Sequence, residues 1–268
     1  MPVSGNRRKA PQAGAFFFLS LFVFWLTSSL TYANKQPCLS NHYNETVKIA
    51  SVHDGNTIRL SDGRKVRIIG INTPELARDD TPAEPFAIQA RDTLKHLIKQ
   101  HVQLKLRWGR EKNDRYGRLL AHLFLPDGRN ISQQLLEQGM AMSLAVPPNL
   151  WQWDCYAAAE TRARKDGAGL WAHPHFQVIA SNKLSPRQRG FHLVQGRVQR
   201  VGFSKSSIWL NLEGRFAIRI KRQDTVHFKK LDFKTLKGKQ VIARGWLQYH
   251  NNELRLRIRH PAALQIMR

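Results

Sequence analysis

The fold is decided by the stretch Val66-Arg67-Ile68-Ile69-Gly70-Ile71-Asn72-Thr73-Pro74-Glu75. Its apolar first half is typical of a buried strand, and Pro74 ends it in a rigid turn that holds Glu75. Residues 57–60 form a second strand-like run, and Ser61-Asp62-Gly63-Arg64 between the two runs contains an Asp-Gly turn signal. The sequence therefore predicts a hairpin with Arg67 on a strand and Glu75 on the turn beyond it.

Strand and helix patterns surround this hairpin. Residues 47–52, 102–108 and 119–125 have the pattern of half-buried strands. Apolar residues with helical spacing occur over 84–99, and two further helices are predicted from Asn130 to Gln138 and over 154–166, each followed by a glycine. The order of strands, helix, strands and helices favours a small antiparallel barrel with helices packed on its outside.

The second part of the chain is also rich in strands. Five strand candidates lie at 194–201, 207–212, 216–220, 240–247 and 254–258, with a helix-like segment at 225–236. Five strands with a helix before the fourth form the chain order of an OB-fold, a small barrel that binds oligonucleotides in many proteins. The sequence thus predicts a second, smaller OB-like barrel.

Charge separates the two parts. The chain has 268 residues and a formal net charge of +24, and its 42% hydrophobic content excludes a wholly disordered protein. Residues 34–182 carry a net charge of +5, and residues 183–268 carry +16. Such an excess indicates a polyanionic partner: nucleic acid first, an anionic membrane or polysaccharide second. The polar stretch 181–190 between the parts is typical of a linker.

Cations and flat rings are interleaved on the predicted strands of the second part. We assign nucleic-acid contacts to Arg197, Arg219, Arg244, Trp246, Arg255 and Arg257, among the further rings Trp209, Phe216 and Tyr249. Cations that follow phosphates, with rings on which bases stack, are what a groove for a single strand requires. The alternative places Trp209 and Trp246 in the barrel core and leaves the arginines as a solvated face.

The N-terminal residues are typical of a targeting segment. Arg7, Arg8 and Lys9 precede an uncharged apolar run over 13–30, and Thr31-Tyr32-Ala33 is a candidate cleavage site. This order predicts a signal peptide over residues 1–33, with an uncleaved membrane anchor as the alternative. In either case the body of the protein lies outside the cytoplasm. There Cys38 and Cys155 can pair, although two free buried thiols remain open.

Three short clusters carry the candidate chemistry: residues 52–57, 66–75 and 114–118. Cleavage of a phosphodiester needs an activated water, neutralised phosphate charge and help for the leaving oxygen. Glu75 can activate the water, and two arginines can fork onto the phosphate oxygens. Oxygen atoms from Asn56, Asn72, Thr73 and Asp54 suit a hard cation such as calcium. Each cluster alone is also compatible with an ordinary turn or strand end.

Together, in this order and at these intervals, the clusters resemble those of the thermonuclease family, the secreted nucleases similar to staphylococcal nuclease. The resemblance covers residues 47–171, including the closing Gly169-Leu170-Trp171. It implies a five-stranded OB-fold barrel with packed helices. The expected fold class is therefore β-rich α+β, with the second small OB-like barrel after the first. It also implies a calcium-dependent endonuclease that cleaves DNA and RNA and leaves 3′-phosphate ends.

The resemblance assigns roles to particular residues. Arg67, Arg118 and Glu75 match the catalytic residues of the family, and Arg115 and Tyr116 fall where members contact the bound nucleotide. Leu144 and Val146 occupy places where the best-known member has base-contacting tyrosines, so that a base preference does not carry over.

The metal positions depart from the family pattern. Asn56 and Asn72 stand where the family usually has calcium-binding aspartates, and Thr73 stands where it supplies a backbone carbonyl. Amides keep an oxygen ligand but lose its negative charge. Because calcium affinity follows ligand charge, we expect weak binding unless Asp54 or a substrate phosphate supplies the missing charge.

The sequence therefore predicts four segments: a signal peptide at 1–33, a nuclease domain at 34–180, a linker at 181–190 and a basic OB-like nucleic-acid-binding domain at 191–268. We expect a monomeric secreted or periplasmic nuclease that acts on DNA, RNA or both, single-stranded by preference, without a stable membrane partner once the leader is removed. One alternative is a protein that keeps the fold and only binds nucleic acid. Another is a module for polyanions or membrane surfaces.

Overall fold

The computed structural model of the chain describes residues 1–3, 5 and 37–267. The basic start, the apolar run and the cleavage site of the predicted leader lie outside these residues. From Gln36 onward the chain forms one compact unit. Within the described residues, no helix has both the length and the apolar character that a membrane span requires.

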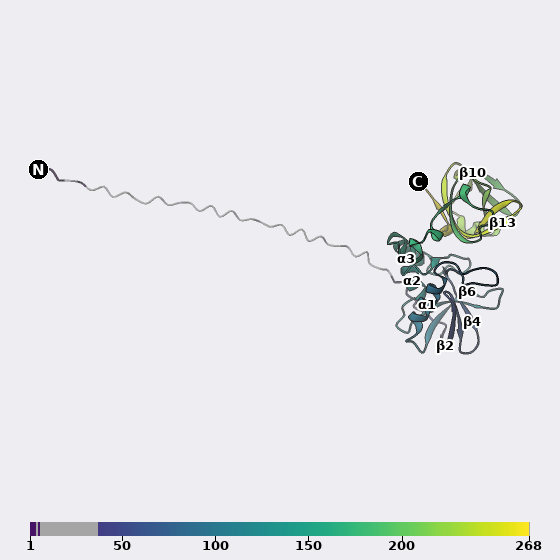
Figure 1. Ribbon diagram of the computed structural model, residues 1–268, viewed down its shortest axis with the longest axis horizontal. Helices are drawn as coiled ribbons and strands as arrows, with labels where there is room; N and C mark the ends of the chain where they lie inside the picture. Colours follow the sequence, from purple (N-terminus) through teal and green to yellow (C-terminus); the bar gives the residue numbers. More distant parts are fainter. Residues whose placement is uncertain (4, 6–36, 268) are drawn as a thin grey trace. The chain divides into compact units, whose positions relative to one another are not determined.

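The first sheet has the strand order β1-β6-β7-β4-β3-β2. Its strands are β1 (Glu45–Val47), β2 (Ile49–Asp54), β3 (Thr57–Leu60), β4 (Lys65–Ile68), β6 (Leu104–Asn113) and β7 (Leu119–Phe124). β1 and β2 are two halves of one segment, of which the first pairs with β6 and the second with β3. Because one segment joins both edges, the sheet closes into a five-stranded barrel, in which β4 and β7 run parallel (Figure 1). This confirms the predicted OB-fold barrel.

The predicted strand over 66–71 is divided in two. β4 ends at Ile68, and Gly70 has a φ of 84°, a left-handed conformation that favours glycine. A Cβ at Gly70 would lie 2.3 Å from a ring carbon of Tyr156, so no larger residue fits. β5 (Ile71–Asn72) then leaves the barrel and pairs with β8 (Met142–Ser143). The break directs Asn72 away from the strand that carries Arg67.

Three α-helices pack around the first barrel: α1 (Ala87–Ile98), α2 (Ile131–Glu137) and α3 (Trp153–Lys165). α1 begins later than predicted because Phe86, with a φ of 67°, breaks the helical backbone just before it. Asn130 caps α2 as predicted, since its side chain accepts a hydrogen bond from the Gln133 N–H. Barrel and helices share one buried core.

A disulfide joins Cys38, just before β1, to Cys155 in α3, and the two Cα atoms lie 5.8 Å apart. It closes a loop over a sequence separation of 117 residues. The bond fixes the segment that begins the barrel to the last helix packed on it.

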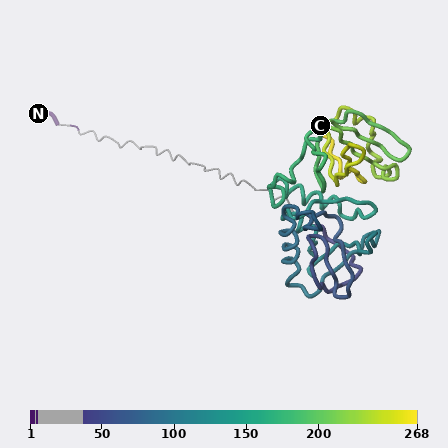
Figure 2. The backbone as a smooth tube through the Cα atoms, turned by 45° about the vertical axis from the view of Figure 1, so that its right-hand side comes forward, coloured from purple at the N-terminus to yellow at the C-terminus, as the bar shows by residue number. Residues whose placement is uncertain are grey.

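The second sheet has seven strands, of which β10 to β14 close into a barrel. The strands are β9 (Ile179–Ala180), β10 (Gly190–Phe203), β11 (Ser207–Leu212), β12 (Phe216–Lys221), β13 (Gln240–His250), β14 (Glu253–Ile258) and β15 (Leu264–Ile266). β10 pairs with both β11 and β13, which closes the ring, and β12 runs parallel to β14. Figure 2 follows this barrel from green to yellow. All five predicted strands fall within β10 to β14, and the barrel repeats the strand order of the first.

The helix-like prediction for 225–236 is wrong in detail. The segment forms two short 3₁₀ helices, η4 (Arg222–Phe228) and η5 (Phe233–Leu236), because the Asp232 side chain accepts from the Lys234 N–H and starts a new turn. Phe228 and Phe233 pack together beneath them, with ring centroids 5.6 Å apart. The remaining 3₁₀ helices are η1 (Gly169–Ala172), η2 (Pro174–Phe176), η3 (Ser181–Lys183) and η6 (Pro261–Ala263).

A third hydrophobic cluster connects the two barrels. It joins Met142, Leu170, Trp171 and Phe176 to Phe191 and Leu193 at the start of β10. The beginning of the predicted linker is also packed: Ser181 is buried, and a Cβ at Gly196 would lie 2.4 Å from its hydroxyl oxygen. The second barrel is therefore held by burial of apolar surface as well as by the chain connection.

Candidate active site

Arg67 is held by backbone carbonyls of the interrupted strand. Its Nη1 donates to the Ile68 carbonyl at 2.8 Å, and its Nη2 donates to the Ile71 carbonyl at 3.3 Å. Burial lowers the pKa of Arg67 to about 10, while the charge of Asp54 acts in the opposite direction. The guanidinium therefore remains cationic near neutral pH and is fixed in position before any ligand arrives.

Arg118 is oriented by the turn that precedes it. Its Nε donates to Asp114 Oδ2 at 2.7 Å, and Asp114 Oδ1 accepts from the backbone N–H groups of Tyr116 and Arg118. Although partial burial acts to raise the pKa of Asp114, these hydrogen bonds keep it below its ordinary value. The carboxylate thus fixes the Nε side of Arg118.

Glu75 lies within the electrostatic reach of both arginines. Its backbone N–H donates to Glu84 Oε2 at 2.9 Å, and the Glu84 N–H donates back to the Glu75 carbonyl at 2.9 Å, which clamps the turn. Burial by the surrounding protein raises the pKa of Glu75 and the charge of Asp54 adds to this, while Arg67 lowers it. Solvent still reaches the side chain. A carboxylate with a raised pKa in contact with water is suited to accept a proton.

One pocket of about 240 Å³ contains both arginines. Arg67 and Arg118 line it together with Asp114, Glu111, Asn149 and the apolar side chains Leu144 and Val146. The structure therefore brings together Arg67 and Arg118, which are 51 positions apart in the chain. A pocket with two cations and a nearby carboxylate can hold a phosphate and offer a base to water.

The predicted metal residues lie at the edge of the same region, largely buried. The Asn56 amide is engaged at both ends: Nδ2 donates to Thr73 Oγ1 at 2.6 Å, and Oδ1 accepts from Thr57 Oγ1 at 3.2 Å. Asn72 Oδ1 is buried without a hydrogen-bond partner among the described residues. Asp54 accepts from the Asn56 N–H at 2.8 Å.

These donors fit a hard cation, although weakly. The unpaired Asn72 oxygen is a buried acceptor of the kind that calcium prefers, and Asp54 adds a carboxylate. Within residues 37–267, however, no three His, Cys, Asp or Glu side chains gather as a metal-binding group. The donor set is poor in charge.

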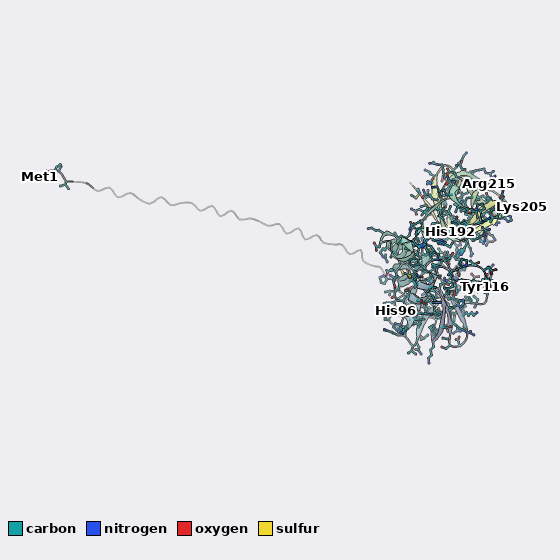
Figure 3. The ribbon with its side chains drawn as sticks, viewed as in Figure 1. Met1, His96, Tyr116, His192, Lys205 and Arg215 are labelled. Carbon is teal, nitrogen blue, oxygen red and sulfur yellow. A yellow bond between two sulfur atoms is a disulfide. The ribbon has the colours of Figure 1, made fainter. Side chains whose placement is uncertain are left out.

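Arg115 and Tyr116 form an exposed pair on the turn between β6 and β7, where Figure 3 labels Tyr116. The Arg115 guanidinium lies 4.7 Å from the centroid of the Tyr116 ring, and that of Arg118 lies 5.5 Å from the same centroid. A solvent-exposed ring beside a cation of the candidate site is available for stacking with a nucleotide.

In the second barrel, the structure separates the predicted contact residues. Arg219 and Arg255 lie beside Trp209, with guanidinium carbons 5.2 and 4.9 Å from its ring centroid. Arg257 instead pairs with the buried Asp224 at 2.7 Å. Arg197 is exposed and donates to the Gly238 carbonyl at 2.9 Å.

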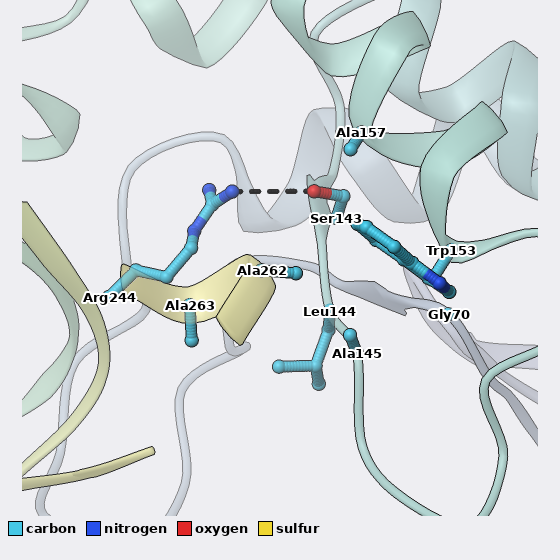
Figure 4. A pocket seen from close by; sticks show the side chains of 9 residues that line it. All are labelled: Gly70, Ser143, Leu144, Ala145, Trp153, Ala157, Arg244, Ala262 and Ala263. Atoms are coloured by element: carbon cyan, nitrogen blue, oxygen red, sulfur yellow. Dashed lines mark hydrogen bonds between the residues drawn. The ribbon is translucent and has the colours of Figure 1, made fainter. Parts of the chain in front are cut away.

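Two residues of that prediction, Arg244 and Phe216, are placed differently, and Trp246 is exposed but partly engaged. Arg244 does not face solvent, because its two Nη atoms donate to the buried Glu160 carboxylate of α3 at 2.8 and 2.6 Å. Figure 4 shows the same guanidinium directed at the Ser143 hydroxyl. Phe216 is core, with 1% exposure. Trp246 is exposed, but its ring packs edge-on against Phe191.

Sequence reasoning gave no role to two residues that shape the pocket. Asp114 orients Arg118, and its position three residues before Gly117 is a local turn signal that could have indicated this. Asn149 fixes β6, since its Oδ1 accepts from the Glu111 N–H and its Nδ2 donates to the Glu111 carbonyl. The contact between Asn149 and Glu111 spans 38 positions, so no local sequence pattern could have predicted it.

Comparison with known proteins agrees with this geometry. The family described as staphylococcal nuclease homologues matches residues 65–173. The thermonuclease of Staphylococcus hyicus is 33% identical over 144 residues, which cover 52% of this chain and 83% of that protein. The thermonuclease of Staphylococcus intermedius is 35% identical over 131 residues, 47% of this chain and 76% of that protein.

A relative from another genus also matches this chain over the first barrel. The endonuclease YncB of Bacillus subtilis (strain 168) is 28% identical over 155 residues, which cover 50% of this chain and 72% of that protein. The family match covers β4, β6 and β7 of the first barrel, the pocket arginines and the three α-helices, whereas β1 to β3 and the second barrel lie outside it. The chain therefore belongs to the thermonuclease family, the staphylococcal nuclease homologues, and is a nuclease.

Proposed function

We propose that this protein is a secreted or periplasmic endonuclease that hydrolyses phosphodiester bonds of DNA, RNA or both, with the help of calcium, and leaves 3′-phosphate ends. The observation that carries the proposal is the pocket that holds Arg67 and Arg118 together, with Glu75 close enough for its charge to act on Arg67. The thermonuclease and endonuclease names of the relatives support the same class of reaction.

The arginines have the positioning role. Each guanidinium is anchored through one side, Arg67 by two carbonyls and Arg118 by Asp114. An anchored guanidinium loses little entropy when it forks onto a phosphate, and it stabilises the negative charge that grows in the transition state. We assign this charge neutralisation to both residues.

Glu75 has the role of the base. It takes a proton from the attacking water, and its raised pKa makes the carboxylate a stronger proton acceptor than an ordinary glutamate. Its position on a clamped turn keeps the carboxylate from collapsing onto the arginines. Within the described residues, no ion pair joins Glu75 to Arg67 or Arg118, so the carboxylate stays available.

A calcium ion bound at this edge would supply positive charge next to the phosphate. Asp54, Asn72 and the Thr73 carbonyl would hold it, with Asn56 as a further oxygen donor once its hydrogen bond to Thr57 is released. Substrate phosphate completes the charge that the two amides lack. We therefore expect calcium to bind more tightly with substrate than without it.

The Cys38–Cys155 disulfide supports a location outside the cytoplasm, where such bonds persist. We propose single-stranded substrates, since a pocket of about 240 Å³ lined by two arginines reaches a single phosphate and its sugar more readily than both strands of a duplex. We propose a monomer, since each of the two cores closes within one chain. Release of the leader leaves no stable membrane partner, whereas an uncleaved leader would anchor the enzyme.

The test is an incubation of the protein with single-stranded DNA and RNA, with calcium or with a chelator, followed by analysis of the ends. Calcium-dependent fragments that accept a 3′ label only after phosphatase treatment are expected. Fragments with free 3′ hydroxyls would contradict the proposed chemistry, and equal cleavage in chelator would contradict the metal.

One observation favours a second candidate, a protein that binds nucleic acid without cleaving it. The metal edge holds amides at Asn56 and Asn72, and one of these amides is already engaged at both ends. Binding of single-stranded DNA with no cleavage at any calcium concentration would establish this second function in place of the first.

A further inference from the structure

The outer face of the second barrel carries a pocket of about 400 Å³ that the family does not account for. We call it the Trp209 pocket; it is lined by Arg200, Phe203, Trp209, Asn211, Glu253 and Arg255. Burial along β11 alternates, with Ile208, Leu210 and Leu212 in the core and Trp209 directed outward. The alternation rules out the reading of Trp209 as core.

Trp209 stands among cations. Besides Arg255, Arg219 of the neighbouring strand lies beside the ring, held by a hydrogen bond from its Nε to Ser207 Oγ at 2.9 Å. A guanidinium that is anchored by a neutral hydroxyl keeps its full charge for another partner. The indole thus has two guanidinium groups at about 5 Å, and that of Arg219 is not paired with a carboxylate of the described residues, so the surface attracts an anion that carries a flat ring.

The charge of the pocket is not neutralised internally. Glu253 pairs with Arg255 at 2.9 Å, and it is the carboxylate of the pocket lining. Within residues 37–267, neither Arg200 nor Arg219 forms an ion pair with any carboxylate. The lining thus offers positive charge that a polyanion can satisfy.

A second ring stands at the rim. Phe203 is 48% exposed, and the guanidinium carbon of Arg222 lies 5.7 Å from its ring centroid. The loop after Phe203 is held in place, because Arg222 Nε donates to the Ser204 carbonyl at 3.1 Å and the Ser204 hydroxyl donates to the Ser207 carbonyl at 3.0 Å. Lys205 extends from this loop (Figure 3). The exposed Phe203 ring and the half-buried Trp209 ring, with interspersed cations, give a site for successive bases and their phosphates.

We propose that the Trp209 pocket binds single-stranded nucleic acid, with a base stacked on Trp209 and the adjoining phosphates on Arg200 and Arg219. It deepens the proposed function, on which it rests for the identity of the strand: the pocket holds the substrate away from the site of hydrolysis. A sulfated polysaccharide would use the cations alone and gain nothing from flat rings.

Binding is measured on the full chain carrying Glu75→Gln, in chelator, so that no cleavage interferes. The probe is a labelled oligothymidylate of about 20 nucleotides, followed by fluorescence anisotropy. Trp209→Ala in this background is expected to weaken binding about tenfold, whereas Trp209→Phe, which keeps a stacking ring, is expected to stay within about threefold. Tryptophan fluorescence should be quenched by the oligonucleotide only while Trp209 is present.

Charge has its own matched control. Arg200→Gln and Lys237→Gln remove the same charge, but Lys237 is exposed on the turn after η5, outside the pocket. Arg200→Gln is expected to reduce the steepness of the salt dependence by about one phosphate contact, and Lys237→Gln to leave it nearly unchanged. Equal effects of the two substitutions would overturn the proposal in favour of diffuse attraction.

Competition separates the remaining outcomes. Heparin or anionic vesicles that displace the oligonucleotide equally well from the Trp209→Ala variant and its parent would also overturn the proposal. Failure of the proposed nuclease function is recognised separately, in the wild-type chain with calcium. A chain that binds through Trp209 but never cleaves refutes the nuclease alone, and one that cleaves while Trp209→Ala binds normally refutes the pocket alone.

Discussion

In both barrels the third strand carries an arginine next to the second strand: Arg67 of β4 is paired with Thr57, and Arg219 of β12 is paired with Trp209. Both third strands also run parallel to the last strand of their barrel. The surroundings differ. The charges of Asp54 and Glu75 act on Arg67, whereas Arg219 lies beside an indole and other arginines.

The difference teaches that strand order supplies positions and leaves the chemistry to the residues placed there. An arginine beside carboxylates can take part in a reaction that moves a proton. An arginine beside aromatic rings can bind a nucleic-acid strand, but no free carboxylate stands next to it to accept a proton. The carboxylates beside these arginines of the second barrel are already paired, Glu253 with Arg255 and the buried Asp224 with Arg257 and Arg259. On the two proposals above, cleavage belongs to the first barrel and holding of the polynucleotide to the second.

The largest expected effect of any change is on the first barrel. Glu75→Gln should lower turnover about a thousandfold, because it removes the base, and should leave oligonucleotide binding nearly intact. The raised pKa of Glu75 means that the ionised form costs stability at neutral pH, so the variant should not unfold at a lower temperature. Turnover is measured in a cleavage assay, oligonucleotide binding by fluorescence anisotropy, and stability by thermal unfolding.

The matched control for Glu75→Gln is Asp127→Asn, which removes an exposed carboxylate from the loop before α2. In the wild type, activity should fall as the pH drops through the raised pKa of Glu75. The same acid limb in the Gln variant, or unchanged turnover, would remove Glu75 from the mechanism.

The disulfide gives the next largest effect. Replacing both Cys38 and Cys155 by Ala should lower the free energy of unfolding by about 4 kcal/mol, since the closed loop is long. The loss should fall on the first barrel, because both cysteines belong to its core. Denaturant unfolding followed by the fluorescence of the second barrel, in single-tryptophan variants that keep Trp209, provides the comparison. A uniform loss across both barrels would mean that they unfold as one cooperative unit.

The third largest effect is expected from breaking the ion pair between the two barrels. Arg244→Met leaves the Glu160 carboxylate buried without its partner and should cost about 3 kcal/mol. Burial acts to raise the pKa of Glu160, but the Arg244 charge and the Ser143 hydrogen bonds hold it below the ordinary value. In the wild type this stability is present above a pH of about 4.3 and is lost as the pH falls through the lower folded value.

In Arg244→Met the pH dependence should reverse, because burial alone then raises the Glu160 pKa and protonation relieves the cost. Urea unfolding near neutral pH and near pH 4 measures both slopes. Arg197→Met, which removes an exposed arginine of the same barrel, is the control and should change little. An unchanged slope in Arg244→Met would show that the pair contributes no net charge energy.

The smallest expected effect concerns the cation. Asn56→Asp combined with Asn72→Asp should tighten calcium binding about tenfold, because two ligand charges are restored. Without calcium the variant should be less stable than the wild type, since the new charges lie near Asp54 and Glu75. The rise in unfolding temperature on calcium addition measures the affinity in both proteins. An equal rise in both would place the ion elsewhere.

Local patterns were enough to predict both barrels. The Asp-Gly turn predicted the β3–β4 hairpin, and alternation predicted the strands of the second barrel, because each depends on neighbours in the sequence. The break at Gly70 was not predictable from the apolar run. It depends on the Tyr156 ring, which reaches the strand from α3.

The candidate site divides in the same way. Arg67, Glu75 and Arg118 stand in short motifs, and their convergence in one region follows from the strand order. Arg244 looked like its neighbours in the sequence, but its partner Glu160 is 84 positions away. Trp209 could be assigned to core or surface from composition alone, and only the register of β11 decides. Long-range pairing determined each of these differences.

The short strand β8 contacts both the candidate metal residues of the first barrel and the contact between the two barrels. Met142 pairs with Asn72 at the metal edge, and its neighbour Ser143 bonds to the Glu160 that Arg244 holds. The third apolar cluster packs the two barrels together at the same place, so the second barrel is held by contacts as well as by the linking chain. The distance between Trp209 and Arg67 would then be fixed. A polynucleotide held at Trp209 and cleaved beside Arg67 would therefore give fragments of a characteristic length.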